Sequence, residues 1–496
     1  MNPKRLFLTL GVVLWFVATA SAQTSTPPPA SPAQAADRSV YSLPNIPKKQ
    51  WIGDLDGMIK RRAIRILVPY SRTFYFADRG TQHGLTYEAF RLFEDDLNKK
   101  LKKENLRIHV LFEPTARDKL TPDLLAGQGD IAVGDLTITP KRLKQVDFSN
   151  PTYRNVSEIV VTGPGAGPIT TAQDLSGKEV YVRRSSSFYE SVELLNAELA
   201  KAGKAPVRVR FAPENLEDGD VLEMVNAGLV KITVVDNLIA EFWAKIFPNL
   251  TLNRGATLRT GGELAWMIRK DSPQLKAELN EFIARYREGS SVRKILLQKY
   301  LQNTEFAKEA TSKEEIAKFE STLDFFRKYC GQYELDYLLM MAQGYQESQL
   351  NQQAKSRVGA IGVMQVMPAI GRDLKVGDIR QTEPNIHAGV KYIRFMMNHY
   401  YANEPMDELN KGLFTFASYN AGPRRIAELR KEAATRGLNP NIWFSNVEVI
   451  ASEKIGRETV QYVSNIYKYY LAYQMIEEQC SEREKAKESV KTGGSP

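Results

Sequence analysis

The chain has 496 residues, of which 43% are apolar and 10% aromatic, and it carries a formal net charge of +9. This length predicts two or three domains with ample material for hydrophobic cores. Lysine and arginine are interleaved with aspartate and glutamate, and no long basic run occurs, so a mildly basic surface is favoured and a nucleic-acid partner is not expected.

The first residues have the pattern of an export signal. The basic pair Lys4-Arg5 precedes the apolar run from Leu6 to Ala20, and Ala20-Ser21-Ala22 has the form of a cleavage site. We expect residues 1–22 to be a signal peptide and the protein to reach an oxidising compartment. The run is short for a membrane span, which needs about 20 residues, and an uncleaved anchor is the alternative. Residues 23–50, rich in Pro, Ser, Thr and Ala, predict a flexible linker.

Strand and helix patterns alternate over residues 51–303, which predicts an α/β domain with largely parallel sheets. Its size favours two lobes. The expected strands are Ala63–Val68, Ile108–Phe112, Ile131–Val133, Ile159–Val161, Val180–Val182, Val207–Phe211 and Ile232–Val235, and the expected helices include Gly84–Leu101 and Glu190–Ala202.

Three segments of this domain carry a family resemblance: Leu125–Ile131, Thr137–Arg142 and Val146–Tyr153. They resemble the periplasmic solute-binding proteins of the amino-acid type, family 3, in which two lobes close on a ligand. The resemblance implies that Arg142 binds the carboxylate of a small peptide or amino-acid-like effector, because guanidinium and carboxylate pair through two hydrogen bonds.

The same resemblance assigns further ligand contacts. It places hydroxyls of the second lobe at Ser186 and Ser187, and a carboxylate for the ligand amine at Asp236. Where the family often has a serine pair before the arginine, this chain has Asp135 and Thr137, and the extra carboxylate favours a ligand with a second amine. The simpler interpretations are a surface ion pair for Arg142 and a helix cap for Asp236.

The second half of the chain is predicted to be helical. We expect a charged linker at 304–318, a helical domain at 319–480 and a disordered charged tail at 481–496. The expected helices are Ile316–Tyr329, Tyr333–Gln349, Ile386–Tyr401, Asp407–Ser418, Pro423–Arg436, Asn446–Ile455 and Glu458–Gln479. Cys330 and Cys480 are the two cysteines. After export they predict one disulfide, and two buried thiols are the alternative.

Glu347 is the candidate catalytic group. It falls at the flank of the apolar face of the helix predicted at Tyr333–Gln349. A carboxyl group that is partly desolvated keeps its proton to higher pH, as a general acid near neutrality requires. For a lone glutamate the simpler interpretation is a solvated side chain near a helix end.

Four ordered motifs change that balance: Glu347-Ser348, Gly362 to Pro368 (GVMQVMP), Ser418 to Gly422 (SYNAG) and Glu458 to Val463 (ETVQYV). Together they resemble the catalytic domain of the lytic transglycosylases built on the goose-type lysozyme fold. The resemblance implies an all-α, lysozyme-like domain in which Glu347 acts first as acid and then as base. It implies that Ser348 orients the acid and that the sugar groove is lined by Met364, Gln365, Tyr419, Asn420, Glu458 and Tyr462.

The two domains in this order resemble the membrane-bound lytic murein transglycosylases of the F type. This implies cleavage of peptidoglycan between N-acetylmuramic acid and N-acetylglucosamine with a 1,6-anhydro product, in the periplasm, peripherally at the outer membrane. We expect no metal and no cofactor, since the four histidines are scattered. The alternatives are a lysozyme-type hydrolase and a non-catalytic solute- or glycan-binding protein.

Overall fold

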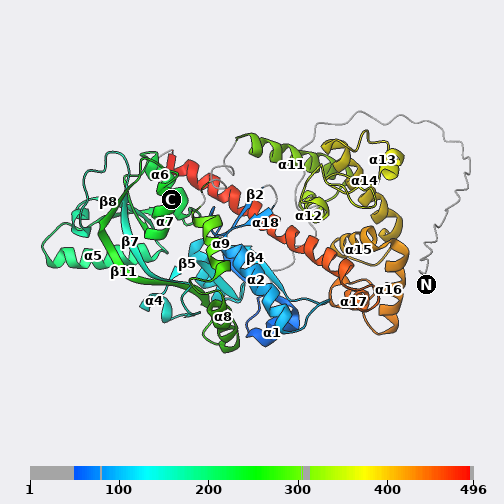
Figure 1. Ribbon diagram of the computed structural model, residues 1–496, viewed down its shortest axis with the longest axis horizontal. Helices are drawn as coiled ribbons and strands as arrows, with labels where there is room; N and C mark the ends of the chain where they lie inside the picture. Colours follow the sequence, from blue (N-terminus) through cyan, green and yellow to red (C-terminus); the bar gives the residue numbers. More distant parts are fainter. Residues whose placement is uncertain (1–49, 79–80, 303, 305–312, 492–496) are drawn as a thin grey trace, which may run out of the picture. The chain divides into compact units, whose positions relative to one another are not determined.

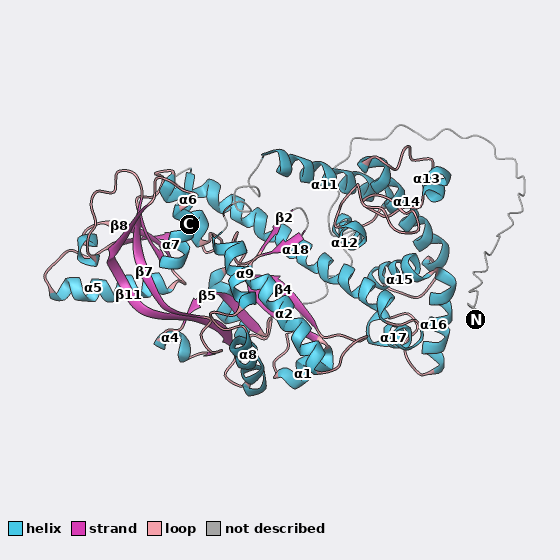
Figure 2. Ribbon diagram, in the orientation of Figure 1, coloured by secondary structure: helices cyan, strands magenta, loops and turns pink. Residues whose placement is uncertain are grey.

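The computed structural model describes residues 50–78, 81–302, 304 and 313–491 (Figure 1). The predicted signal peptide and nearly all of the predicted linker at 23–50 lie outside the described residues. All described residues belong to one compact unit, 42–496. Every strand among the described residues precedes residue 269, and residues 313–491 consist of helices joined by loops (Figure 2).

The first region contains a mixed sheet with strand order β4-β1-β5-β11-β7-β10-β8-β9, and β6 pairs with β11. The pairs β1–β4, β1–β5, β8–β9 and β8–β10 are parallel, whereas β11 and β7 run antiparallel to their neighbours. The α/β prediction is therefore confirmed, but the expectation of largely parallel strands is wrong, because β7 and β11 cross the sheet antiparallel to their neighbours. The strands are β1 Ala63–Val68, β4 His109–Pro114, β5 Ile131–Thr137, β6 Asp147–Phe148, β7 Tyr153–Thr162, β8 Glu179–Arg183, β9 Arg208–Ala212, β10 Ile232–Asp236 and β11 Thr251–Ile268, with a separate pair β2 Phe76–Asp78 and β3 Thr81–His83.

Two lobes arise because the sheet serves separate hydrophobic cores. One core packs β1, β4 and β5 against helices α2 and α8, and the other packs β7, β8 and β10 against α5 and α7. Strands β7 and β11 run through both lobes. The sequence patterns missed β11, because Arg254, Gly255 and the pair Gly261-Gly262 interrupt its alternation. The helices are α1 Leu55–Arg61, α2 Leu85–Lys100, α3 Leu120–Leu125, α4 Pro140–Leu143, α5 Ser187–Lys201, α6 Asp218–Asn226, α7 Asn237–Ala244, α8 Pro273–Arg285 and α9 Ser291–Leu297.

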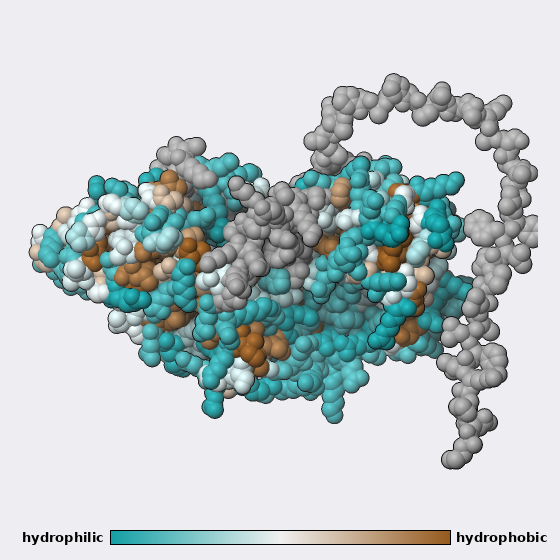
Figure 3. Space-filling view, turned by 45° about the horizontal axis from the view of Figure 1, so that its top comes forward, coloured by the Kyte–Doolittle hydropathy of each residue, from teal (hydrophilic) through white to brown (hydrophobic). Residues whose placement is uncertain are grey.

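The helical region is built around a single core, in which Phe326, Phe414, Trp443 and Val463 are fully buried. Its helices are α11 Lys313–Tyr333, α12 Tyr337–Ser348, α13 Pro368–Leu374, α14 Thr382–Tyr401, α15 Glu408–Ala421, α16 Pro423–Thr435, α17 Glu448–Lys454 and α18 Arg457–Lys491. This confirms the predicted helical second domain. On the face that Figure 3 shows, hydrophilic residues surround separate apolar patches.

Several predicted helix boundaries are wrong; for example, the helix expected at Ile316–Tyr329 extends over Lys313–Tyr333. The helix expected to begin at Tyr333 begins at Tyr337, since Glu334 has a positive φ and Asp336 caps the new helix through the Leu338 and Leu339 amides. The disorder predicted from residue 481 is also wrong, because α18 continues to Lys491. Residues 481–491 are rich in the strong helix formers Glu, Lys and Ala.

The predicted disulfide is not supported either. Cys330 is a free thiol, 1% exposed, on the inner face of α11. It packs as a small apolar group among the aromatic and aliphatic side chains of the helical core. The side chain of Cys480 lies outside the described part of the chain. Between the two interpretations offered by the sequence, the structure favours the buried thiol for Cys330.

Candidate active site and ligand cleft

Glu347 lies in the last turn of α12. The helix ends there because Gln349 and Leu350 both take the left-handed conformation. The inner face of α12 is buried in the helical core, whereas Glu347 itself is half-buried at its edge. The predicted position at the flank of the apolar face is therefore confirmed.

The surroundings of Glu347 keep its carboxyl group protonated near neutrality. Burial raises the pKa of Glu347 to about 7, and the hydroxyl of Tyr462, which donates to Oε1 at 2.5 Å, opposes this rise. Among the described residues, no arginine, lysine or second carboxylate contributes to this pKa. Gln343 in turn donates to the Tyr462 hydroxyl at 3.4 Å. An uncharged, half-buried acid held by one hydroxyl can give a proton to a leaving group and take one back.

The loop after Glu347 is held by one buried amide side chain. Asn385 of α14 accepts from the Met364 amide and donates to the carbonyls of Ile361 and Ile379. Gly362 has a φ of 79°, and a Cβ there would lie 2.3 Å from Asn385 Nδ2. Only glycine allows the backbone to pass this close.

This loop corrects the role predicted for Met364. Its side chain is fully buried in the helical core and touches Gly344 and Gly389, so it supports the loop and does not line a groove. Gln365 has a φ of 46°, and its amide donates to the carbonyl of Gly362 at 2.9 Å. The Gln365 side chain therefore holds the turn together as well.

Ser348 of α12 and Tyr419 of α15 hold this loop from two helices. The Ser348 hydroxyl donates to the carbonyl of Val363 at 2.8 Å, and the Tyr419 hydroxyl donates to the carbonyl of Met364 at 2.8 Å. The carboxyl group of Glu347 is one of the causes that raise the pKa of Tyr419, after burial, so the Tyr419 ring lies close to the acid. Both side chains position the site.

An open polar groove lies beside Glu347. Asn420, at the end of α15, is fixed by the Thr459 hydroxyl at 2.7 Å, and Glu458 is exposed at the start of α18. The residues that line the groove are Gln346, Asn420, Arg457, Glu458, Gln461, Tyr462 and Asn465. The motifs identified three of them. Gln461 and Asn465 follow Glu458 and Tyr462 at helical spacing, which is the signal that could have found them.

The cleft between the lobes of the first region brings most of the predicted ligand residues together. Arg142 donates to the carbonyl of Thr137 at 2.8 Å and, across the cleft, to that of Ser185 at 3.1 Å. The hydroxyls of Thr137 and Ser187 lie 3.1 Å apart. The guanidinium of Arg142 therefore binds backbone carbonyls in the cleft, and the simpler interpretation of a surface ion pair does not hold. Ser186 differs, since its hydroxyl caps α5 and donates to the carbonyl of Arg183.

Carboxyl groups gather in the same cleft. Asp236 is 2% exposed, its Oδ1 has no hydrogen-bond partner, and burial raises its pKa well above the usual range, with the charges of Glu158, Asp135 and Asp218 adding to the rise. It forms no side-chain cap on α7. Burial also raises the pKa of Asp135 to about 8.

One ion pair in this cleft was not anticipated from the sequence. Arg117 of the first lobe donates twice to Glu217 of the second, at 2.8 and 2.6 Å. Both side chains are less than 10% exposed. No sequence motif marks either residue, because the pairing depends on how the two lobes close.

Comparisons with known proteins agree with this architecture. Residues 66–303 match the bacterial extracellular solute-binding proteins, family 3, and residues 324–442 match the transglycosylase SLT domain. A membrane-bound lytic murein transglycosylase F of Pseudomonas fluorescens is 28% identical over 431 residues, which cover 82% of this chain and 84% of the relative. Its namesake from Desulfosudis oleivorans is 26% identical over 428 residues, covering 82% and 89%.

Among solved structures, a putative L-cystine ABC transporter from Listeria monocytogenes is 18% identical, with a TM-score of 0.42 over 48% of this chain and 95% of that chain. No helix among the described residues is long and apolar enough to cross a membrane. The chain therefore carries a family 3 solute-binding domain followed by a transglycosylase SLT domain, and over most of its length it is related to the membrane-bound lytic murein transglycosylases F.

Proposed function

We propose that the protein is a peptidoglycan lytic transglycosylase that uses Glu347 as its single acid and base. Protonated Glu347 gives its proton to the oxygen that links N-acetylmuramic acid to N-acetylglucosamine. The resulting carboxylate takes the proton of the muramic C6 hydroxyl as that oxygen attacks the anomeric carbon. The bond to the leaving sugar breaks, a 1,6-anhydro ring forms, and no water is consumed.

The observation that carries this proposal is the environment of Glu347, a half-buried carboxyl group that accepts a hydrogen bond from Tyr462 and lies beside an open polar groove. Glycoside hydrolases generally work with two carboxyl groups about 5–10 Å apart. Burial and Tyr462 are the two causes that shift the pKa of Glu347, and among the described residues no charged carboxylate contributes. With a pKa of about 7, Glu347 is available in both protonation states near neutral pH.

Substituting Glu347 tests the proposal directly. The Glu347→Gln variant keeps the shape of the side chain and cannot exchange a proton, so release of soluble fragments from purified sacculi should fall at least about 10²–10⁴-fold. Glu453→Gln, at an exposed site on α17, serves as the control and should keep full activity. Unchanged release by Glu347→Gln would exclude Glu347 as the acid.

We also propose that the solute-binding domain takes a cell-wall peptide and thereby regulates the enzyme. Asp236 and Asp135 lie in a cleft where Arg183 pairs with Asp218 and Arg259 pairs with Glu158, while Oδ1 of Asp236 has no hydrogen-bond partner. A buried carboxyl group without such a partner favours a cationic ligand. This supports a muropeptide whose diamino acid supplies the second amine.

Helix α18 offers a physical route for such regulation. At its start Tyr462 bonds Glu347, and less than two turns later Lys468 is buried, its charge facing Glu94 of the first lobe. Near its end Lys487 lies 3.5 Å from Asp220 of the second lobe. A ligand that changes the angle between the lobes would therefore favour a different position of α18.

The regulatory proposal is tested with the full-length protein. Adding a purified muropeptide should change the rate of sacculus digestion, and Lys487→Ala should reduce that response while keeping the basal rate. Lys485→Ala, at an exposed position two residues earlier on α18, is the control. A rate that stays constant up to saturating muropeptide would contradict regulation through this domain.

A further inference from the structure

A row of aromatic side chains leads from the catalytic site along the surface of α14. Tyr419, which adjoins the groove residue Asn420 and donates to the carbonyl of Met364, packs edge-on against Tyr392, with ring centroids 5.8 Å apart. Tyr392 lies nearly parallel to Phe395 at 6.2 Å, and Phe395 nearly parallel to His399 at 5.5 Å. Tyr392, Phe395 and His399 recur at helical spacing, so they form one stripe.

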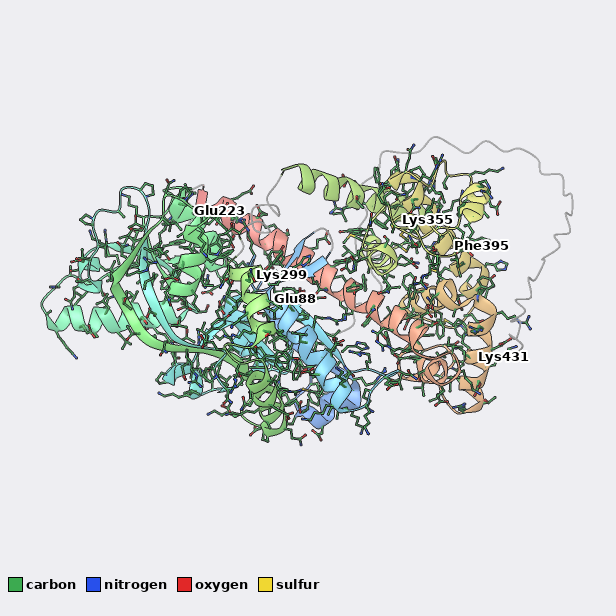
Figure 4. All side chains as sticks on the ribbon, in the orientation of Figure 1. Glu88, Glu223, Lys299, Lys355, Phe395 and Lys431 are labelled. Carbon is green, nitrogen blue, oxygen red and sulfur yellow. The ribbon has the colours of Figure 1, made fainter. Side chains whose placement is uncertain are left out.

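The outer members of this stripe face solvent. Phe395 is 52% exposed, His399 is exposed, and the adjoining Tyr400 is 40% exposed; Figure 4 marks Phe395 on α14. Single exposed apolar residues are ordinary, but connected ones indicate a binding surface. The separation of the ring centres exceeds the spacing of rings in direct face-to-face contact, so the rings are laterally offset and keep part of their faces free.

We propose that Tyr392, Phe395 and His399, the α14 aromatic stripe, form a distal binding surface for the glycan strand whose scissile bond lies at Glu347. This rests on the proposed function. Two observations select a glycan as the occupant. The stripe is continuous with the catalytic site through Tyr419, and it consists of flat rings, two of them with polar groups, without an aliphatic member.

The chemistry of a sugar fits this surface. A pyranose ring presents C–H groups on its faces and hydroxyls at its edges. The electron-rich face of an aromatic ring attracts the C–H groups, while the Tyr392 hydroxyl and the His399 ring nitrogens can bond the hydroxyls. A strand that is held along α14 would remain attached after each cleavage, so the stripe favours long strands over short ones.

The test compares substrates of two lengths. Phe395→Ala should lower kcat/KM on long, uncross-linked glycan strands about 3–10-fold and leave kcat/KM on a muropeptide tetrasaccharide unchanged. Phe395→Tyr should keep the wild-type preference. Leu194→Ala, which removes an apolar side chain 64% exposed on α5, is the matched control and should change neither substrate. An equal loss on both substrates, or no loss, would overturn the proposal.

A further variant separates a glycan from a membrane as the occupant. Phe395→Leu keeps apolar area and removes the ring, so it should lose the preference for long strands as Phe395→Ala does. A membrane contact predicts a different result. In that case Phe395→Leu keeps the preference for long strands, and Phe395→Ala reduces the fraction of protein that sediments with anionic phospholipid vesicles. Sedimentation with sacculi at 4 °C measures strand binding without turnover, so failure of this proposal is distinguishable from failure of the catalytic one.

Discussion

Both clefts of the protein bury carboxyl groups, but the neighbours of those groups differ. In the helical domain burial and the hydroxyl of Tyr462 set the pKa of Glu347, whereas in the solute-binding domain the pKa of Asp236 is raised by burial and by the nearby carboxylates, of which Asp218 and Glu158 pair with arginines. An isolated buried carboxyl group titrates near neutral pH and can transfer protons. A buried cluster needs a compensating cation and is suited to bind one. In the proposed function, the same residue type serves acid–base chemistry in one cleft and ligand recognition in the other.

Among the further substitutions that distinguish the two clefts, Tyr462→Phe is expected to lower kcat the most. The Tyr462 hydroxyl donates to the carboxylate of Glu347, and a hydrogen bond to a charged group contributes about 1.5–3 kcal/mol, so kcat should fall about 10–100-fold. Because this bond lowers the pKa of Glu347, its loss should move the alkaline limb of the pH–rate profile to higher pH. Tyr467→Phe, one turn and a half further along α18, is the control and should leave the profile in place.

In the ligand cleft, Asp236→Asn should weaken binding of a muropeptide with a free diamino-acid amine about tenfold. The reason is that the variant lacks the carboxylate that would pair with this amine. Calorimetry with the wild-type protein and the variant measures this. The same peptide with its side-chain amine acetylated should bind both proteins alike. If Asp236→Asn binds the free amine as tightly as the wild type, the carboxylates do not select a cation. Glu241→Gln makes the same carboxyl-to-amide change at an exposed position on α7, and it should leave binding unchanged.

The pH dependence of the unfolding free energy gives a second test of the raised pKa of Glu347. Its folded pKa of about 7 exceeds the ordinary value of 4.5, so its contribution to folding is full below pH 4.5 and is lost as pH rises through 7. Glu347→Gln removes this titration. Relative to the wild type, the variant should gain on the order of 1–3 kcal/mol in unfolding free energy between pH 5 and pH 8. Urea unfolding at both pH values measures the gain, and an equal difference at the two pH values would contradict the raised pKa.

The smallest effect is expected from Met364→Leu. Since Met364 is fully buried, this volume-conserving change should cost less than about 1.5 kcal/mol of stability, and the KM for glycan strands should stay unchanged. A rise in KM without loss of stability would mean that Met364 contacts the sugar.

The fold classes, most elements and the position of Glu347 at the flank of an apolar helix face could be predicted from the sequence, because strand and helix periodicities are local. Met364 was misplaced because a motif does not say which way a side chain points. The Arg117–Glu217 pair was missed because it joins residues far apart in the chain. The end of α18 was missed because a charged segment rich in helix formers resembles a disordered tail until its packing is known.

The mass of the products tests the central claim most directly. Purified sacculi are digested with the full-length protein, and the released muropeptides are weighed by mass spectrometry. If Glu347 works alone as acid and base, the muramic ends carry the 1,6-anhydro ring and are one water lighter than the products of hydrolysis. Reducing, hydrated ends as the main product would contradict the account. A water molecule would then attack the sugar, activated by Glu458, the carboxylate of the groove, or by another group.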